Sequence, residues 1–272
     1  MTYVWFFLYA VWYTLGAVVI CGLAVSLCRK LFVSMMGGGF GRGVVMATSI
    51  VGTPVHELGH ALMCLLFGHK ITDMALWQPR AQDGNLGFVT HAYRKRNPYH
   101  VLGNLFIGIG PIFSGLGVLA LALWLGFPQS FGEYTATAAG MATAGEGELA
   151  IMGEGLKMIP RMWQELTQGE TASLWGKIIA LLVIFSVAQH ISLSPADIKG
   201  ALSAIPLYLV LILLLTGVCG LLGASAMESV TEALSLFSAS LTALFVVVLI
   251  CASIQLVIAL PVWILRKLLR LP

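Results

Sequence analysis

Long apolar segments alternate with shorter polar ones along the whole chain. Each apolar segment has about 20 residues or more, which is the length that an α-helix needs to cross the hydrocarbon core of a bilayer. We predict about six membrane-spanning helices, at Tyr3–Cys28, Val44–Gly68, His100–Phe127, Leu174–Leu193, Ala201–Gly223 and Leu234–Leu265. The pattern therefore predicts an all-α polytopic membrane protein.

The composition supports this class of protein and excludes others. Of the 272 residues, 58% are hydrophobic and 10% are charged, and the mean hydropathy is +0.92. These values exclude an ordinary soluble domain. The net charge of +3 is spread over the loops, so we expect no nucleic-acid partner. The five cysteines lie in or beside apolar segments without a C-x-x-C pair, so we expect neither a disulfide framework nor a thiolate metal site.

Two polar stretches interrupt the apolar pattern. Residues 69–99 form an excursion in which Asn85–Tyr93 has strand-like composition, so we predict a small β-hairpin there. Residues 128–173 are rich in glutamate, and we expect them to form a connector on the membrane surface rather than a span. The chain then divides into an N-terminal transmembrane helix and loop (1–43), a membrane core (44–215) and a C-terminal transmembrane region (216–272).

An even number of spans places both termini on the same side of the membrane. Basic residues gather on that side, at Arg94-Lys95-Arg96 and again at Arg266 and Lys267. Because cytoplasmic loops carry an excess of Lys and Arg, we predict a multi-pass protein of the cell membrane with both termini in the cytoplasm.

The second predicted span carries the pattern H-E-x-x-H, at His56-Glu57-Leu58-Gly59-His60. On an α-helix the two histidines lie one turn apart on the same face, so both imidazoles can bind one metal ion. Zinc suits two imidazoles and an oxygen ligand, and Glu57 is placed to act as general base on a water at that metal. Ionisable side chains are costly at the centre of an apolar span, which favours a functional site over an accidental cluster.

A catalytic zinc ion usually has three protein ligands, and the sequence offers several candidates for the third. We favour Asp197, because it is the acidic residue beside an apolar span that also follows a predicted helix break, at Ser194-Pro195. His190 is an alternative ligand, or else it donates to a substrate carbonyl or to a neighbouring backbone group. Asn104 and Pro111 are candidates for lining the site. The remaining alternative ligands are Glu133, Glu146, Glu148, Glu154, Glu165 and Glu170.

The order of these motifs resembles the site-2 protease family of intramembrane zinc metalloproteases. The resemblance rests on H-E-x-x-H in one span, Gly110-Pro111 in the next, and Pro195-Ala196-Asp197 in a broken span. It covers roughly residues 44–215 and implies a three-helix core like that of the family. It also implies that the zinc ligands are His56, His60 and Asp197 and that the general base is Glu57.

Two other functions fit the same sequence. A non-proteolytic binding or assembly factor, or a small-solute transporter, could use this scaffold, although a structural metal site does not need the base that Glu57 provides. A different H-E-x-x-H membrane protease, of the prenyl-protease-like group, would take a downstream glutamate as its third ligand. We predict an intramembrane zinc metalloendopeptidase that acts on a membrane-embedded protein or peptide substrate in or near its transmembrane segments.

Overall fold

The computed structural model describes residues 2–80, 85–146, 148–169 and 171–269, and this part of the chain is mostly helical. In chain order its elements are α1 (Tyr3–Val11), a π-helical turn (Trp12–Gly16), α2 (Ala17–Met36), α3 (Gly38–Leu66), β1 (Lys70–Ala75), β2 (Phe88–Ala92), α4 (Pro98–Gly126), α5 (Pro128–Thr143), α6 (Glu148–Gln168), α7 (Leu174–His190), α8 (Pro195–Leu202), α9 (Ile205–Leu222) and α10 (Ala224–Leu268). The strands β1 and β2 form an antiparallel pair. The prediction of a mostly helical chain with a small hairpin is therefore confirmed.

Several helices are long and apolar enough to cross a membrane, which indicates a membrane-embedded protein. Within the described residues these are Tyr3–Met36, Pro98–Gly126, Ile205–Leu222 and Ala224–Leu268, and α7 and α8 form a further pair with a bend of 63°. The helix α3, which contains most of the predicted span Val44–Gly68, falls outside this set. Its motif residues are strongly hydrophilic and lower its hydropathy. The number of six spans therefore stays a prediction.

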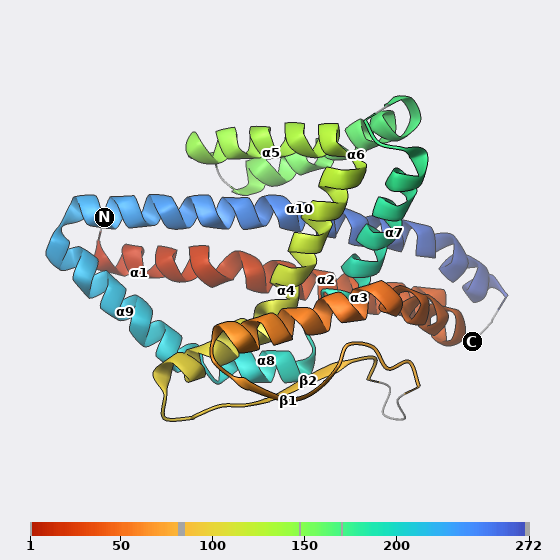
Figure 1. Ribbon diagram of the computed structural model, residues 1–272. Helices are drawn as coiled ribbons and strands as arrows, with labels where there is room; N and C mark the ends of the chain where they lie inside the picture. The colour runs from red at the N-terminus through yellow and green to blue at the C-terminus, as the bar shows by residue number, and fades with distance from the viewer. Residues whose placement is uncertain (1, 81–84, 147, 170, 270–272) are drawn as a thin grey trace.

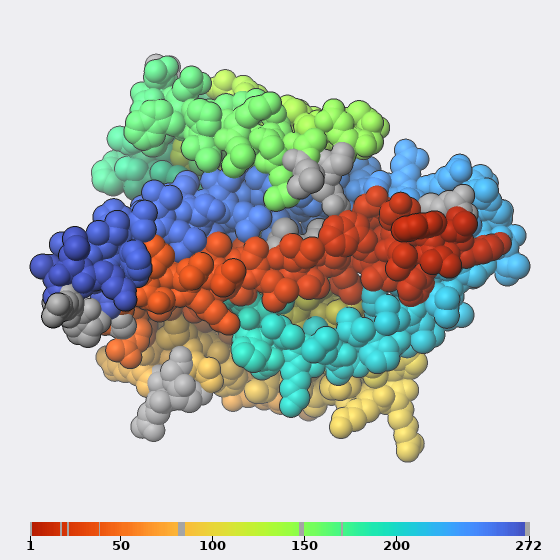
Figure 2. Space-filling view, turned by 180° about the vertical axis from the view of Figure 1, so that it is seen from behind, coloured from red at the N-terminus to blue at the C-terminus, as the bar shows by residue number. Residues whose placement is uncertain are grey.

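The helices form a crossed arrangement (Figure 1). The α1–α2 segment and α10 run side by side along the long direction of the molecule, and α4 and α7 run across them. The pair α5 and α6 lies against α10 on one side, whereas α3, α8 and the hairpin lie on the other. From behind, α1–α2 runs across the middle of the face between α10 and α9 (Figure 2). Since α4 contacts α3, α7 and α8 as well as α5, it connects the two sides.

The first and last helical segments run parallel to each other. Phe6 of α1 packs against Met227 near the start of α10, while Arg266 near the end of α10 donates to the carbonyl of Met35 in α2 at 3.1 Å. At 1.5 Å per residue, the 45 residues of α10 extend about 68 Å, roughly twice the thickness of a hydrocarbon core. The cytoplasmic placement of both termini stays a prediction, and this parallel arrangement does not favour it.

The glutamate-rich stretch forms the antiparallel helix pair α5 and α6. Arg161 of α6 contacts two carboxylates, with Nη2 at 2.9 Å from Glu154 Oε1 and Nε at 3.5 Å from Glu133 Oε2. The carboxylate of Glu165 accepts from the hydroxyl of Ser130 at 2.6 Å. These three glutamates are therefore engaged inside the helix pair, on the side of α4 that is remote from α3 (Figure 1).

The helices α3 and α4 come into close backbone contact at two glycines. A Cβ atom on Gly59 would lie 2.6 Å from the carbonyl oxygen of Gly110, and a Cβ atom on Gly110 would lie 2.6 Å from that of Gly59. Beside them, Ser114 Oγ donates to the carbonyl of Val55 at 2.8 Å. Because Gly59 is part of the H-E-x-x-H pattern, this contact sets the distance between the motif and α4.

We predict that Gly59→Ala or Gly110→Ala lowers the free energy of unfolding by about 1–3 kcal/mol, because the added methyl group would press on backbone atoms that cannot move aside. The measurement is an unfolding curve of the purified protein in detergent. Gly117→Ala is the matched control, since a Cβ atom there meets nothing within 4 Å. Equal unfolding midpoints for all three variants would contradict the prediction.

Candidate metal centre

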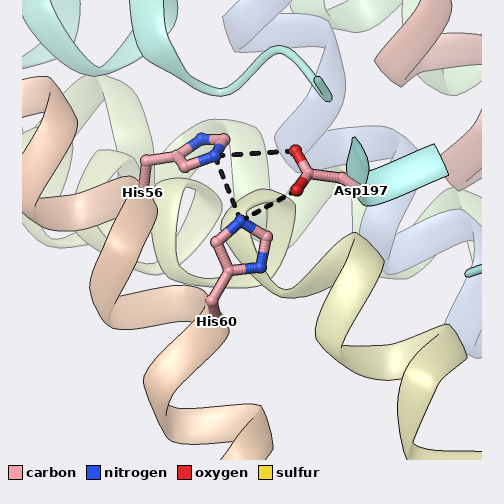
Figure 3. A group of neighbouring side chains, drawn as sticks. All are labelled: His56, His60 and Asp197. Atoms are coloured by element: carbon pink, nitrogen blue, oxygen red, sulfur yellow. Dashed lines mark hydrogen bonds and ion pairs between the residues drawn. The ribbon is translucent and has the colours of Figure 1, made fainter. Parts of the chain in front are cut away.

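The structure brings His56, His60 and Asp197 together at one point between α3 and α8 (Figure 3). The Nε2 atom of His60 lies 3.2 Å from Asp197 Oδ1, and that of His56 lies 3.7 Å from Asp197 Oδ2. The two Nε2 atoms are 3.2 Å apart. Among the described His, Cys, Asp and Glu residues, this is the one group of three whose ligand atoms come within 4.8 Å of one another.

Backbone carbonyls orient both imidazole rings. His56 Nδ1 lies 2.8 Å from the carbonyl oxygen of His190, and His60 Nδ1 lies 2.7 Å from that of Ile107. A carbonyl oxygen only accepts, so each Nδ1 carries the proton and donates it. In the neutral form of each ring, Nε2 is therefore left with a lone pair, and both Nε2 atoms face the carboxylate of Asp197.

This arrangement of donors fits a divalent cation. Two unprotonated nitrogens and a carboxylate repel one another at these distances unless a positive charge lies among them. Two nitrogens that bind one tetrahedral zinc ion at about 2.0–2.1 Å lie about 3.3–3.4 Å apart, close to the 3.2 Å between His56 and His60. Metal-binding histidines also donate their second N–H to a carbonyl or carboxylate in most proteins. That an ion binds here, and that it is zinc, stays a prediction.

Asp197 reaches the centre because the chain bends between α7 and α8. Ser194 caps the N-terminus of α8, and Pro195 occupies the first turn, where its missing N–H costs nothing. In this capping box the N–H of Ser194 donates to Asp197 Oδ2 at 2.7 Å, and the N–H of Asp197 donates to Ser194 Oγ at 3.2 Å. The backbone thus holds one carboxylate oxygen and leaves Oδ1 directed at His60.

Glu57 lies beside the centre in a cavity of about 1240 Å³. Its side chain is only 6% exposed. The residue directly before β2 covers it, because a Cβ atom on Gly87 would lie 2.8 Å from Glu57 Cγ and 3.0 Å from the carbonyl of Ala75. Only a glycine at position 87 lets the hairpin come this close to the carboxylate.

The other residues that the sequence suggested for the centre have other positions or roles. The ring of His190 is buried between Thr48 Oγ1 at 3.1 Å and Thr53 Oγ1 at 3.4 Å, so only its carbonyl serves the centre. Asn104 lines the cavity, and Pro111 is buried inside α4. The placement of Glu170 lies outside the described residues, as does the side chain of Glu148.

A second group of histidines, which the sequence did not predict, joins the hairpin to α4. His69 Nε2 donates to the carbonyl of His100 at 2.8 Å, so His69 Nδ1 accepts from His91 Nδ1 at 2.9 Å. The ring of Tyr93 stacks on His69 with the ring centres 4.9 Å apart. Burial lowers the pKa of both His69 and His91, and each is further lowered by a neighbouring histidine. No regular spacing links these residues, so the pattern carried no signal for them.

No protein-family model, curated protein or solved structure matches this chain.

We predict that the purified wild-type protein binds close to one zinc ion per chain, and that His56→Ala, His60→Ala and Asp197→Ala each bind much less. Removing one of three ligands leaves too few donors to compete with water. Metal analysis of detergent-purified protein measures this ratio. Glu57→Gln is the matched control, because it changes a neighbouring carboxylate while leaving all three donors. Loss of zinc from His56→Ala but not from Asp197→Ala would place the third ligand elsewhere.

We predict that His69 and His91 titrate below pH 6.5, the pKa of an unperturbed histidine. The folded hairpin favours the neutral rings, because protonation of His69 at Nδ1 would set two N–H groups against each other. The contribution of the two residues to stability is therefore complete above pH 6.5 and is lost as the pH falls through their lowered pKa values.

The titration is followed by NMR of the histidine Cε1–H signals, which His69→Asn and His91→Asn variants assign. Titration midpoints at or above pH 6.5 for both residues would show that His69 is not held as a neutral acceptor and His91 is not held as a neutral donor.

Proposed function

We propose that this protein is an intramembrane zinc metalloprotease that hydrolyses peptide bonds in or near the transmembrane segments of its substrates. The observation that carries the proposal is the meeting of His56 Nε2, His60 Nε2 and Asp197 Oδ1 beside the buried carboxylate of Glu57. The resemblance of the motif order to the site-2 protease family supports it. The long apolar helices support an active centre that works within or beside a membrane.

In this mechanism Glu57 is the group that moves protons. A zinc ion held by His56, His60 and Asp197 would supply a Lewis acid, which makes a bound water acidic and polarises a carbonyl. Glu57 accepts a proton from the attacking water while the oxygen of that water forms a bond to the scissile carbon. It then returns a proton to the departing nitrogen as the C–N bond breaks, which leaves one new carboxyl group and one new amine.

The hairpin is placed to hold the substrate in an extended form. A helical peptide bond is shielded by its own hydrogen bonds, so the substrate has to unwind before attack. The segment Gly87–Val89 lines the same cavity as Glu57, and β2 has β1 along one edge in the described two-stranded sheet. An unwound segment that pairs with the other edge of β2 would have its backbone fixed next to the centre.

The two alternative functions have less support. Glu57 is a buried carboxylate beside the candidate metal ligands. A non-proteolytic factor does not need a carboxylate in that position. A protease with a glutamate as third ligand would need one near His56 and His60. Glu133, Glu154 and Glu165 are instead engaged within α5 and α6.

We predict that the wild-type protein, reconstituted with zinc in detergent or lipid, cleaves at least one member of a panel of transmembrane peptides, and that Glu57→Gln cleaves it about 10²–10⁴-fold more slowly. Mass spectrometry of the products measures both the rate and the cleaved bond. Because the variant keeps all three metal ligands, its metal content should equal that of wild type.

Glu228→Gln is the control, since it changes an exposed carboxylate of α10 and should leave the rate unchanged. Equal rates for Glu57→Gln and wild type would overturn the assignment of Glu57 as the base. Metal-loaded wild type that cleaves no peptide of the panel would favour the non-proteolytic alternative.

A further inference from the structure

The cavity that contains the candidate centre has a basic side. Arg29 and Lys30 of α2 and Arg42 of α3 line it, together with the hydroxyl groups of Ser26 and Ser34. The carboxylates among its lining residues are Glu57 and Asp197, and both belong to the candidate centre. Away from the centre, the charged side chains among its described lining residues are therefore all basic.

Arg29 is the cation most closely connected to the centre. It lies half-buried on α2, directly before Lys30, and its Nη1 donates to Ser192 Oγ at 2.9 Å. Within the described residues, none of the ion pairs with a carboxylate involves Arg29. A guanidinium group has five N–H donors and is costly to bury without a negative partner. Arg29 thus has charge and donors to offer to a ligand.

Ser192 places this charge beside the metal ligands. It lies in the break between α7 and α8, two residues after His190, whose carbonyl orients His56. It also lies two residues before Ser194, which caps the helix that carries Asp197. The guanidinium of Arg29 therefore adjoins the segment from which the centre is built, rather than a distant part of the wall.

We propose that Arg29, with Lys30 beside it, forms a subsite that binds a carboxylate of the peptide substrate. This inference rests on the proposed protease function and names a specificity that the function alone does not imply. The planar guanidinium suits a carboxylate, which it can bind through two parallel hydrogen bonds. The carboxylate comes either from an Asp or Glu side chain near the scissile bond or from the C-terminus of the substrate.

A peptide occupant is favoured over a lipid phosphate by the continuity of the cavity. The basic residues, the hairpin segment and the metal ligands line one and the same space of about 1240 Å³. A peptide held along β2 would occupy that space on both sides of the scissile bond. A lipid headgroup bound at Arg29 would instead occupy part of the space that this peptide needs.

The test compares four versions of one peptide, with Glu or Gln next to the scissile bond and with a free or an amidated C-terminus. For wild type we expect kcat/KM to be about tenfold or more higher for one charged version than for its neutral counterpart. The pair that shows this preference identifies the source of the carboxylate. The preference should disappear in Arg29→Gln and should remain in part in Arg29→Lys. The control is Arg96→Gln, which changes an exposed arginine outside the cavity and should leave the preference intact.

Binding of the four peptides is also measured with Glu57→Gln, alone and combined with Arg29→Gln, so that the subsite is tested without cleavage. Tighter binding of a charged version that Arg29→Gln removes would support the subsite even if no peptide is cleaved and the proposed function fails. If Arg29→Gln weakens the charged and neutral versions equally, Arg29 only holds the break through Ser192, and the proposal is overturned. It is likewise overturned if vesicles of anionic lipid abolish the preference that neutral vesicles preserve, because a lipid phosphate then occupies the site.

Discussion

Two imidazole lone pairs and a carboxylate that point at one another inside an apolar protein are the constraint on which this structure depends. Left alone, such groups would turn away or take up protons, because buried like charges and facing lone pairs are costly. Here the backbone prevents them from turning. The carbonyls of His190 and Ile107 hold the two rings, and the N–H of Ser194 holds the carboxylate of Asp197.

Close packing between helices brings these groups into range. The contact of Gly59 with Gly110 lets α4 come near enough for the carbonyl of Ile107 to reach His60. The bend of 63° between α7 and α8 turns the chain back toward α3 and leaves Asp197 in the first turn of α8. A straight, uninterrupted helix through residues 174–202 could not present both the carbonyl of His190 and the carboxylate of Asp197 to the same two rings.

The sequence predicted the parts of this site that arise from local periodicity. The spacing of His56 and His60 places them on one helical face, and Ser194-Pro195 marks the break before Asp197. The strand near Phe88–Ala92 followed from its composition. The contributions of Ile107 and His190 could not be predicted, because they are backbone carbonyls and every residue has one. The parallel contact of α1–α2 with α10, and the pairing of His69 with His91, depend on tertiary packing between distant segments and leave no periodic trace.

The two donor rings stand on α3, the third donor on α8, and the orienting carbonyls on α4 and α7. No single helix hairpin contains this set, so these donors meet only in the fully packed state. An ion held there would bind the native form and not the separated helices, and its binding free energy would add to the folding free energy. At a free concentration one hundred times its dissociation constant, the gain is about 2.7 kcal/mol. Metal supply would then regulate the lifetime of the folded protein in the membrane as well as the chemistry of its centre.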